Sequence, residues 1–125
     1  MLYRTVEQNL RAGFRNRSSE PIISPDEGVE RLGLARLLGR EVTTLSIGEA
    51  QRVALLCAIL HGPEMLIIDE SLAGLDPEGI NAVRDLILLL REQDKCILLI
   101  SHLKKFINLF CDIQIPLNIP IGALN

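Results

Sequence analysis

Two apolar runs of the sequence end in polar side chains that can carry out chemistry. Asp69 and Glu70 follow the run 65–68, and His102 follows the run 96–100. Adjacent carboxylates suit a divalent metal plus a base, so that Asp69 can hold Mg²⁺ while Glu70 orients or deprotonates an attacking water. A histidine at the end of the next strand can sense or stabilise a phosphate. The alternative is that the two carboxylates cap the following turn and that His102 is an ordinary surface histidine.

Another candidate site lies at residues 46–49, Ser-Ile-Gly-Glu, at the start of a long apolar segment. Ser46 and Glu49 have the spacing of a capping box, in which each side chain bonds the backbone of the other residue. A helix that begins here presents free N–H groups and the positive end of its dipole, which together favour an anion. A plain capping box explains Ser46 and Glu49 equally well, but it does not explain Gly48.

The elements that position these residues are predicted from apolar periodicity and capping signals. We expect helices at 6–10, 24–38, 49–61, 76–93 and 103–110, and strands at 65–68, 96–100 and 113–117. The first two strands are apolar throughout, which favours strands buried in a parallel sheet. The helix after Ser46 has almost no polar face beyond Arg52, so we expect it to be largely buried. Helices that alternate with strands predict an α/β fold with a parallel sheet and crossover helices.

The composition limits the class of protein. The chain has 125 residues, of which 48% are hydrophobic and 23% are charged, and its net charge is −3. This length allows one domain at most, and the weakly acidic balance argues against a broad nucleic-acid surface. Because no apolar run approaches the ~20 residues of a membrane helix and the first residues lack a signal peptide's apolar stretch, we expect a soluble, cytoplasmic protein. Cys57, Cys96 and Cys111 form no C-x-x-C pair, so we expect buried, reduced thiols rather than a zinc site.

Four motifs, in order along the chain, resemble those of the ATP-binding cassette (ABC) ATPases. Residues 45–52, Leu-Ser-Ile-Gly-Glu-Ala-Gln-Arg, resemble the signature motif, and residues 65–70 resemble the Walker B strand with its catalytic glutamate. Residues 71–76, Ser-Leu-Ala-Gly-Leu-Asp, resemble the D-loop, and Ser101-His102 resembles the H-loop. Residues 5–10 also resemble the segment that follows the family's Q-loop. The resemblance therefore covers nearly the whole chain.

The resemblance implies a partial P-loop NTPase-like cassette in two parts. Residues 1–62 would be the helical signature subdomain with the segment after the Q-loop. Residues 63–125 would be the C-terminal part of the RecA-like ATPase core, which holds the later parallel strands and their crossover helices. In that family two cassettes sandwich two ATP molecules. The implied roles at the chain's own site are Mg²⁺ coordination for Asp69, activation of water for Glu70 and contact with the γ-phosphate for His102.

The resemblance also implies contacts beyond this chain. Ser46, Gly48 and Glu49 of the signature would bind the ATP held by a second cassette, and Asp76 of the D-loop would link the two sites. A transmembrane permease subunit would dock on the helical subdomain, about residues 5–60. This would place the chain at the inner face of the cell membrane. The implied activity is ATP binding and hydrolysis coupled to solute transport.

The sequence departs from the family pattern at several positions and lacks one motif. Ile47 stands where Gly is frequent and Glu49 where Gln is usual, while Ser71 and Leu72 replace the usual Pro and Ser or Thr. The changes at 71 and 72 leave the metal and base untouched but alter the D-loop. No G-x-x-x-x-G-K-[ST] loop occurs, so the chain resembles a C-terminal part that lacks Walker A and the Q-loop. We therefore expect it to bind ATP poorly and not to hydrolyse it alone, and to require a Walker A half as partner.

The type of ABC protein is less closely defined by the residues. The short stretch between residues 10 and 45 resembles importer-type and small exporter-type cassettes, and residues 73–79 resemble energy-coupling-factor cassettes. The sequence Glu-Ala-Gln-Arg at 49–52 also resembles the signature of a DNA-repair ATPase, although the zinc modules of that family are not present in this stretch. A degenerate, non-catalytic half-cassette is a third hypothesis. The transported substrate is not specified by a cassette.

Overall fold

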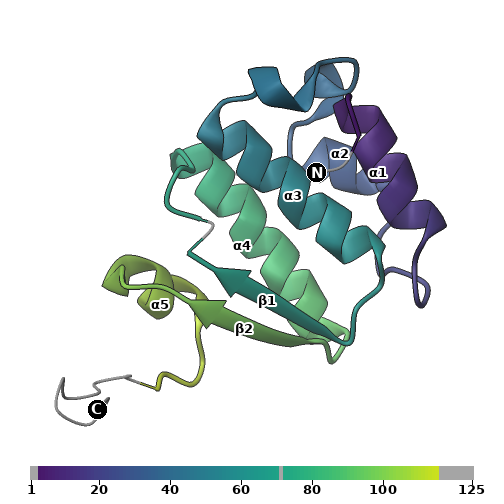
Figure 1. The fold of residues 1–125 in the computed structure, drawn as a ribbon. Coiled ribbons are helices and arrows are strands. Elements are labelled where there is room, and N and C mark those ends of the chain that lie inside the picture. The colour runs from purple at the N-terminus through teal and green to yellow at the C-terminus, as the bar shows by residue number, and fades with distance from the viewer. Residues whose placement is uncertain (1–2, 71, 116–125) are drawn as a thin grey trace, which may run out of the picture.

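The computed structural model describes residues 3–70 and 72–115, and it confirms an α/β fold (Figure 1). In chain order the elements are α1 (Val6–Arg15), α2 (Pro25–Arg31), the 3-10 turns η1 (Ala35–Leu37) and η2 (Val42–Thr44), α3 (Ile47–Leu60), β1 (Met65–Asp69), α4 (Pro77–Glu92), β2 (Cys96–Ile100) and α5 (Lys104–Phe110). The first three helices group together at one end, and the strands with α4 and α5 form the other end. Among the described residues, no helix is both long and apolar enough to cross a bilayer.

Polar caps determine where the longer helices begin. The side chains of Ser24, Ser46 and Asp76 each accept a hydrogen bond from the backbone N–H three residues later, as the capping signals predict. Thr5 caps α1 in the same way, and that helix continues to Arg15, well beyond the predicted end at residue 10. The predicted helix starts agree with the structure to within two residues, the largest difference being α3, which begins at Ile47 and not at residue 49.

The predicted extent of the second helix, to residue 38, is wrong. The helix ends at Arg31, because Gly33 takes a left-handed φ of 64° that no α-helix accommodates. The chain then turns, and Leu34 and Leu37 enter the core from a 3-10 turn. The apolar residues at 32, 34, 37 and 38 have helical spacing in the sequence, but they lie in an irregular segment, where the first three are buried and Leu38 is partly buried.

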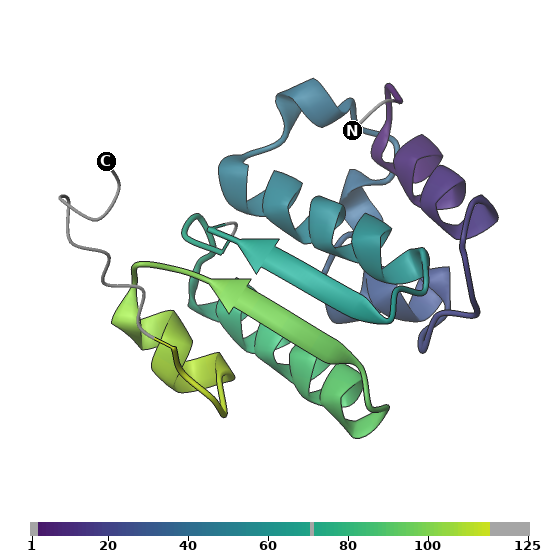
Figure 2. The ribbon, with the colours of Figure 1, turned by 60° about the horizontal axis from the view of Figure 1, so that its bottom comes forward.

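Strands β1 and β2 form a parallel pair in which Met65 lies opposite Cys96 and Asp69 lies opposite Ile100. Helix α4 connects them and runs along one face of the pair (Figure 2). Leu66 and Ile68 point toward this helix and are buried. Because the register fixes both strand ends at the same edge, the polar residues that follow the strands are brought together.

The prediction that both strands are fully buried is wrong. The side chains on the face away from α4 are large and apolar, and they are exposed: Met65, Ile67, Leu98 and Ile100. Parallel sheets normally have both faces covered, whereas the described residues supply a helical layer on one face alone. We call the surface formed by these four side chains the open sheet face.

The core is one continuous cluster that joins all the long helices to the sheet. Helix α3 was predicted to be largely buried, and it contributes five buried apolar side chains to this cluster: Val53, Leu55, Leu56, Ile59 and Leu60. Ile113–Ile115 of the predicted third strand are not in a strand, and residues 116–117 lie outside the described residues. The expectation of buried thiols holds in part, because Cys57 and Cys111 are partly buried and Cys96 is exposed.

Candidate functional site

Glu70 and His102 meet at the edge of the sheet where both strands end. The His102 backbone N–H donates to Oε1 of Glu70 at 3.0 Å, and Nδ1 of His102 lies 3.0 Å from Oε2 of the same carboxylate. Both oxygens of Glu70 are therefore engaged by one residue of the neighbouring strand end. The sequence predicted that these two side chains share an edge, and the structure adds that they form a direct pair.

Glu70 has an unusual backbone conformation. Its φ of 55° lies in the left-handed region, which costs a non-glycine residue about 1 kcal/mol. The Glu70 N–H donates to the Ile100 carbonyl at 2.8 Å, and the bonds from His102 fix the carboxylate. Strain of this kind is characteristic of functional positions, where the surrounding structure imposes it. No sequence pattern indicated it, because glutamate is not a residue that favours this region.

Asp69 stands at the end of β1, next to this pair, and its side chain is exposed. A carboxylate is the kind of ligand that Mg²⁺ prefers, and Mg²⁺ is typically bound by one or two carboxylates together with substrate phosphates and water. No group of three or more metal-ligating side chains occurs within 3–70 and 72–115. Asp69 therefore fits a magnesium ion whose other ligands come from outside the described residues.

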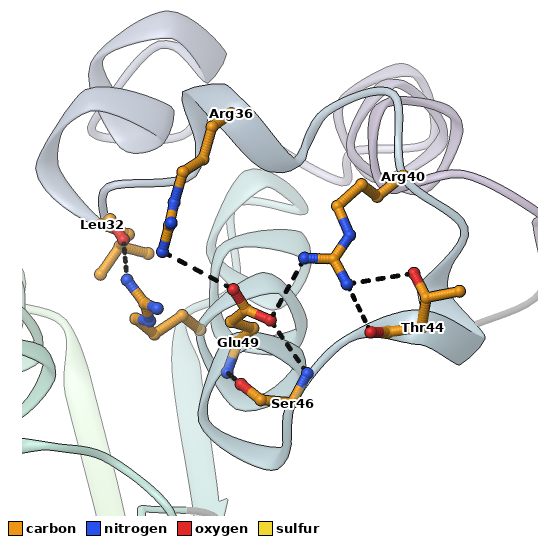
Figure 3. A network of polar contacts seen from close by, with 7 residues as sticks. Leu32, Arg36, Arg40, Thr44, Ser46 and Glu49 are labelled. Carbon is orange, nitrogen blue, oxygen red and sulfur yellow. Dashed lines mark hydrogen bonds and ion pairs between the residues drawn. The ribbon is translucent and has the colours of Figure 1, made fainter.

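The second group of candidate residues lies at the start of α3. The hydroxyl of Ser46 accepts from the Glu49 N–H at 3.1 Å, and Oε1 of Glu49 accepts from the Ser46 N–H at 2.9 Å (Figure 3). Ile47 and Gly48 are the first two helical residues, whose N–H groups have no partner within a helix. The serine O–H can still donate outward while its oxygen accepts. This helix end can therefore receive an acceptor-rich anion.

Two arginines flank the carboxylate of Glu49 (Figure 3). Oε2 lies 3.8 Å from Arg36 and Oε1 lies 3.7 Å from Arg40, and the glutamate side chain is 14% exposed. The Ser46 backbone N–H is the main cause that lowers the pKa of Glu49, and Arg40 and Arg36 lower it further. Glu49 is therefore a charged member of the capping box at neutral pH. Neither arginine was predicted to have a role, since a basic residue on a surface carries no distinctive signal.

Gly48 faces another part of the chain at close range. A Cβ at this position would lie 2.6 Å from the carbonyl oxygen of Gly74, and the Gly74 N–H donates to Oε1 of Gln51 at 3.1 Å. The first turn of α3 thus packs directly on the loop before α4. The sequence interpretation assigned Gly48 to close approach of a phosphate, and the structure supplies a further reason for its small size.

Asp76 begins α4 and acts as its cap. Its Oδ1 accepts from the Gly79 N–H at 2.7 Å. The loop that carries Asp76 follows the strand end with Glu70 and contacts the start of α3. Position 71, where the sequence departs from the family pattern, lies outside the described residues, while Leu72 is buried.

Comparison with known proteins identifies the family. The sequence profile described as ABC transporter matches residues 3–73, more than half of the chain. The chain belongs to this ABC transporter family. The match includes the signature and the strand with Asp69 and Glu70.

Relatives within the ABC transporter family are similar over much of this chain. The uncharacterized ABC transporter ATP-binding protein YhcH of Bacillus subtilis is 43% identical over 88 residues, which are 70% of this chain and 29% of YhcH. The energy-coupling factor transporter ATP-binding protein EcfA1 of Mycoplasma pneumoniae is 36% identical over 101 residues, 78% of this chain and 37% of EcfA1. A solved structure described as the ATP binding subunit of an ABC transporter covers 90% of this chain and 49% of its own, with a TM-score of 0.66 and 30% identity. The chain thus spans less than half the length of these two curated relatives.

The predicted site residues of this ABC chain fall into two groups. Glu70 and His102 are bonded to each other, with Asp69 beside them. Ser46 and Glu49 are bonded at the start of α3, where Gly48 contacts the loop that leads to Asp76. No hydrogen bond between described residues joins the Glu70 group to the Ser46 group directly.

Proposed function

We propose that this chain is the C-terminal part of the nucleotide-binding subunit of an ABC transporter, in which ATP binding and hydrolysis drive solute transport. The observation that carries the proposal is the Glu70–His102 pair next to Asp69 at the strand ends of an ABC-family chain. The two curated relatives are ATP-binding proteins of transporters, which favours transport over the DNA-repair alternative.

The roles proposed for the strand-end residues follow from their chemistry. The Glu70 carboxylate accepts hydrogen bonds and acts as general base toward a water that attacks the γ-phosphate. His102, anchored through Nδ1, presents its other ring nitrogen to that phosphate. Asp69 would hold the Mg²⁺ of Mg-ATP, which neutralises phosphate charge when bound. Ser46 and Gly48 would contact the ATP of a second cassette, whereas the charged Glu49, expected to share this contact, would instead hold Ser46 through the capping box.

The proposed partners follow from what the described residues leave incomplete. The sequence holds no Walker A loop, so another polypeptide segment has to bind the phosphates. The open sheet face (Met65, Ile67, Leu98 and Ile100) supports this, because a Walker A half that includes a covering layer would bury it. A second cassette and a transmembrane permease subunit complete the proposed assembly. It would lie at the cytoplasmic side of the cell membrane.

Phosphate release from Mg-ATP tests the proposal. The chain alone is expected to give no turnover, because it lacks the phosphate-binding loop. Mixed with the part of YhcH that precedes its matched segment, it is expected to hydrolyse ATP, and Glu70→Gln should lower the rate about 10²-fold or more, since a general base is lost. Glu78→Gln, at an exposed position of α4, is the matched control.

Each contrary result has a defined meaning. If the chain alone hydrolyses ATP and Glu70→Gln abolishes this turnover, the requirement for a Walker A half is contradicted. A complex that forms and binds ATP without hydrolysing it would contradict the catalytic role and favour the non-catalytic half-cassette.

A further inference from the structure

We propose that Arg36 and Arg40 are positioning residues for the start of α3: they neutralise the Glu49 carboxylate, so that this helix end accepts a polyphosphate anion despite a negative charge within its first turn. The inference rests on the proposed function of Ser46 and Gly48. It adds two residues that lie outside the signature motif.

Glu49 presents an electrostatic problem for anion binding at this place. Its carboxylate is hydrogen-bonded to the Ser46 N–H, so it stays next to the serine hydroxyl and to the free N–H groups of the first turn. A fixed negative charge at this position repels a phosphate. A glutamine could accept the same bond without charge. The negative charge of Glu49 is therefore not required for the hydrogen bonds of the capping box.

The two arginines are placed to cancel that charge. They come from η1 and from the segment before η2, on the side of α3 where the glutamate points (Figure 3). Arg36 lies next to Oε2 and Arg40 next to Oε1, so each carboxylate oxygen has its own cation. Arg52, on the same helix as Glu49, donates instead to the Leu32 carbonyl at 2.8 Å. The charged groups that face the carboxylate are thus both positive.

Arg40 is itself held in place. Its Nη2 donates to the carbonyl oxygen of Thr44 at 2.5 Å and lies 3.3 Å from the hydroxyl of the same residue. The guanidinium therefore bridges the turn before α3 and the first turn of the helix. Arg36 is the more exposed partner, with 78% of its side chain accessible. Exposed ion pairs of this length contribute little to stability, so their main effect is on local charge.

The test measures tripolyphosphate binding by NMR at low ionic strength, about 20 mM, where screening is weak. The backbone amide signals of Ile47 and Gly48 report binding, and the carboxyl signal of Glu49 reports its pKa. The variants are Arg36→Gln/Arg40→Gln, the same pair combined with Glu49→Gln, and the control Arg11→Gln/Arg31→Gln. The control removes two arginines that pair within α1 and α2, so it changes the net charge equally.

The Arg36→Gln/Arg40→Gln variant is expected to bind tripolyphosphate about five-fold more weakly than the wild type, because the glutamate charge is no longer cancelled. Adding Glu49→Gln should restore most of the affinity, and the control pair should bind nearly as the wild type does. The pKa of Glu49 should rise in the arginine variant and stay below its ordinary value, since the Ser46 N–H is the main cause of the lowering.

The outcomes separate the two proposals. The role of the arginines is overturned if the wild type binds at Ile47 and Gly48 and the arginine variant binds equally well. It is also overturned if adding Glu49→Gln fails to restore the lost affinity. In both cases the anion role of the signature stands. The absence of any shift at these amides in the wild type overturns the proposed anion role itself. Restoration by Glu49→Gln is the outcome that a purely structural role of the arginines would not give.

Discussion

The carboxylate of Glu70 and the imidazole of His102 define each other's orientation. A histidine anchored through Nδ1 keeps Nε2 directed away from its partner, and the His102 side chain is 75% exposed. The pair therefore needs no rearrangement within the described residues to face a ligand at the sheet edge. Its members are 32 positions apart in the sequence, and the parallel register is what brings them together.

The three thiols are expected to differ in reactivity because their surroundings differ. Burial raises the pKa of Cys57 to about 11, so about one thousandth of it is thiolate at pH 8, and the thiolate is the reactive form. Burial and the charge of Asp112 raise the pKa of Cys111, whereas Cys96 is exposed. Maleimide labelling at pH 8, followed by mass spectrometry of peptides, should modify Cys96 first and Cys57 last.

The variant Cys96→Ser is the control for this experiment, since it should remove the fast phase and leave the slow ones. If Cys57 is labelled as fast as Cys96, α3 is packed less tightly against its neighbours than the structure shows.

At the scale of elements, the start of α3 and the loop that follows β1 are packed as one unit. We expect Gly48→Ala to lower the free energy of unfolding by about 1–3 kcal/mol, because the new Cβ would lie 2.6 Å from the Gly74 carbonyl and backbone has to move. Urea denaturation followed by circular dichroism measures the change.

Gly39→Ala is the matched control, because no atom lies within 4 Å of the Cβ that it adds. It should leave the unfolding midpoint nearly unchanged. Equal midpoints for the two variants would show that the loop yields without cost and that Gly48 is not needed for packing.

Local signals in the sequence were enough to predict the helix starts, the two strands and the α/β class. Ser24, Ser46 and Asp76 act on groups three residues away, so their effect is readable from the sequence alone. The end of α2 was not predicted, because Gly33 could equally have sat within the apolar periodicity of a longer helix. The division into residues 1–62 and 63–125 stays a prediction, since one core cluster includes side chains from both parts.

The sequence predicted which residues form the candidate site, but it did not predict which partners they contact. The strand ends place Glu70 near His102 by topology, so their proximity followed from the α/β pattern. The partners Arg36, Arg40 and Gln51 could not be predicted, because each is a polar residue whose contact depends on how two distant segments pack. The roles that the resemblance implies for Ser46, Asp69 and the other site residues stay predictions.

At the scale of the whole molecule, the sheet has one covered and one uncovered side. Ile67 and Leu98 lie opposite each other in the register, and they are 58% and 48% exposed. Apolar patches of this kind promote association in a chain that lacks their partner. We expect the isolated chain to self-associate with rising concentration, and Ile67→Thr/Leu98→Thr to reduce this while keeping the strand preference of both positions.

Sedimentation velocity over a range of concentrations measures the effect. Leu88→Thr, which removes an exposed apolar side chain from α4 away from the open sheet face, is the control and should not reduce association. Identical sedimentation of the wild type and the double variant would contradict the prediction.

The bond between Gln51 and Gly74 has a mechanical consequence. Helix α3 has 14 residues and is therefore a stiff rod about 21 Å long. Next to its far end, the His61 carbonyl accepts from the Ser18 N–H at 2.9 Å. A tilt of about 5° around that end displaces the Ser46 end by about 2 Å, which is enough to break the Gln51 bond unless the loop travels with the helix. A tilt of α3 thus either moves the loop that carries Asp76 or breaks its bond to Gln51.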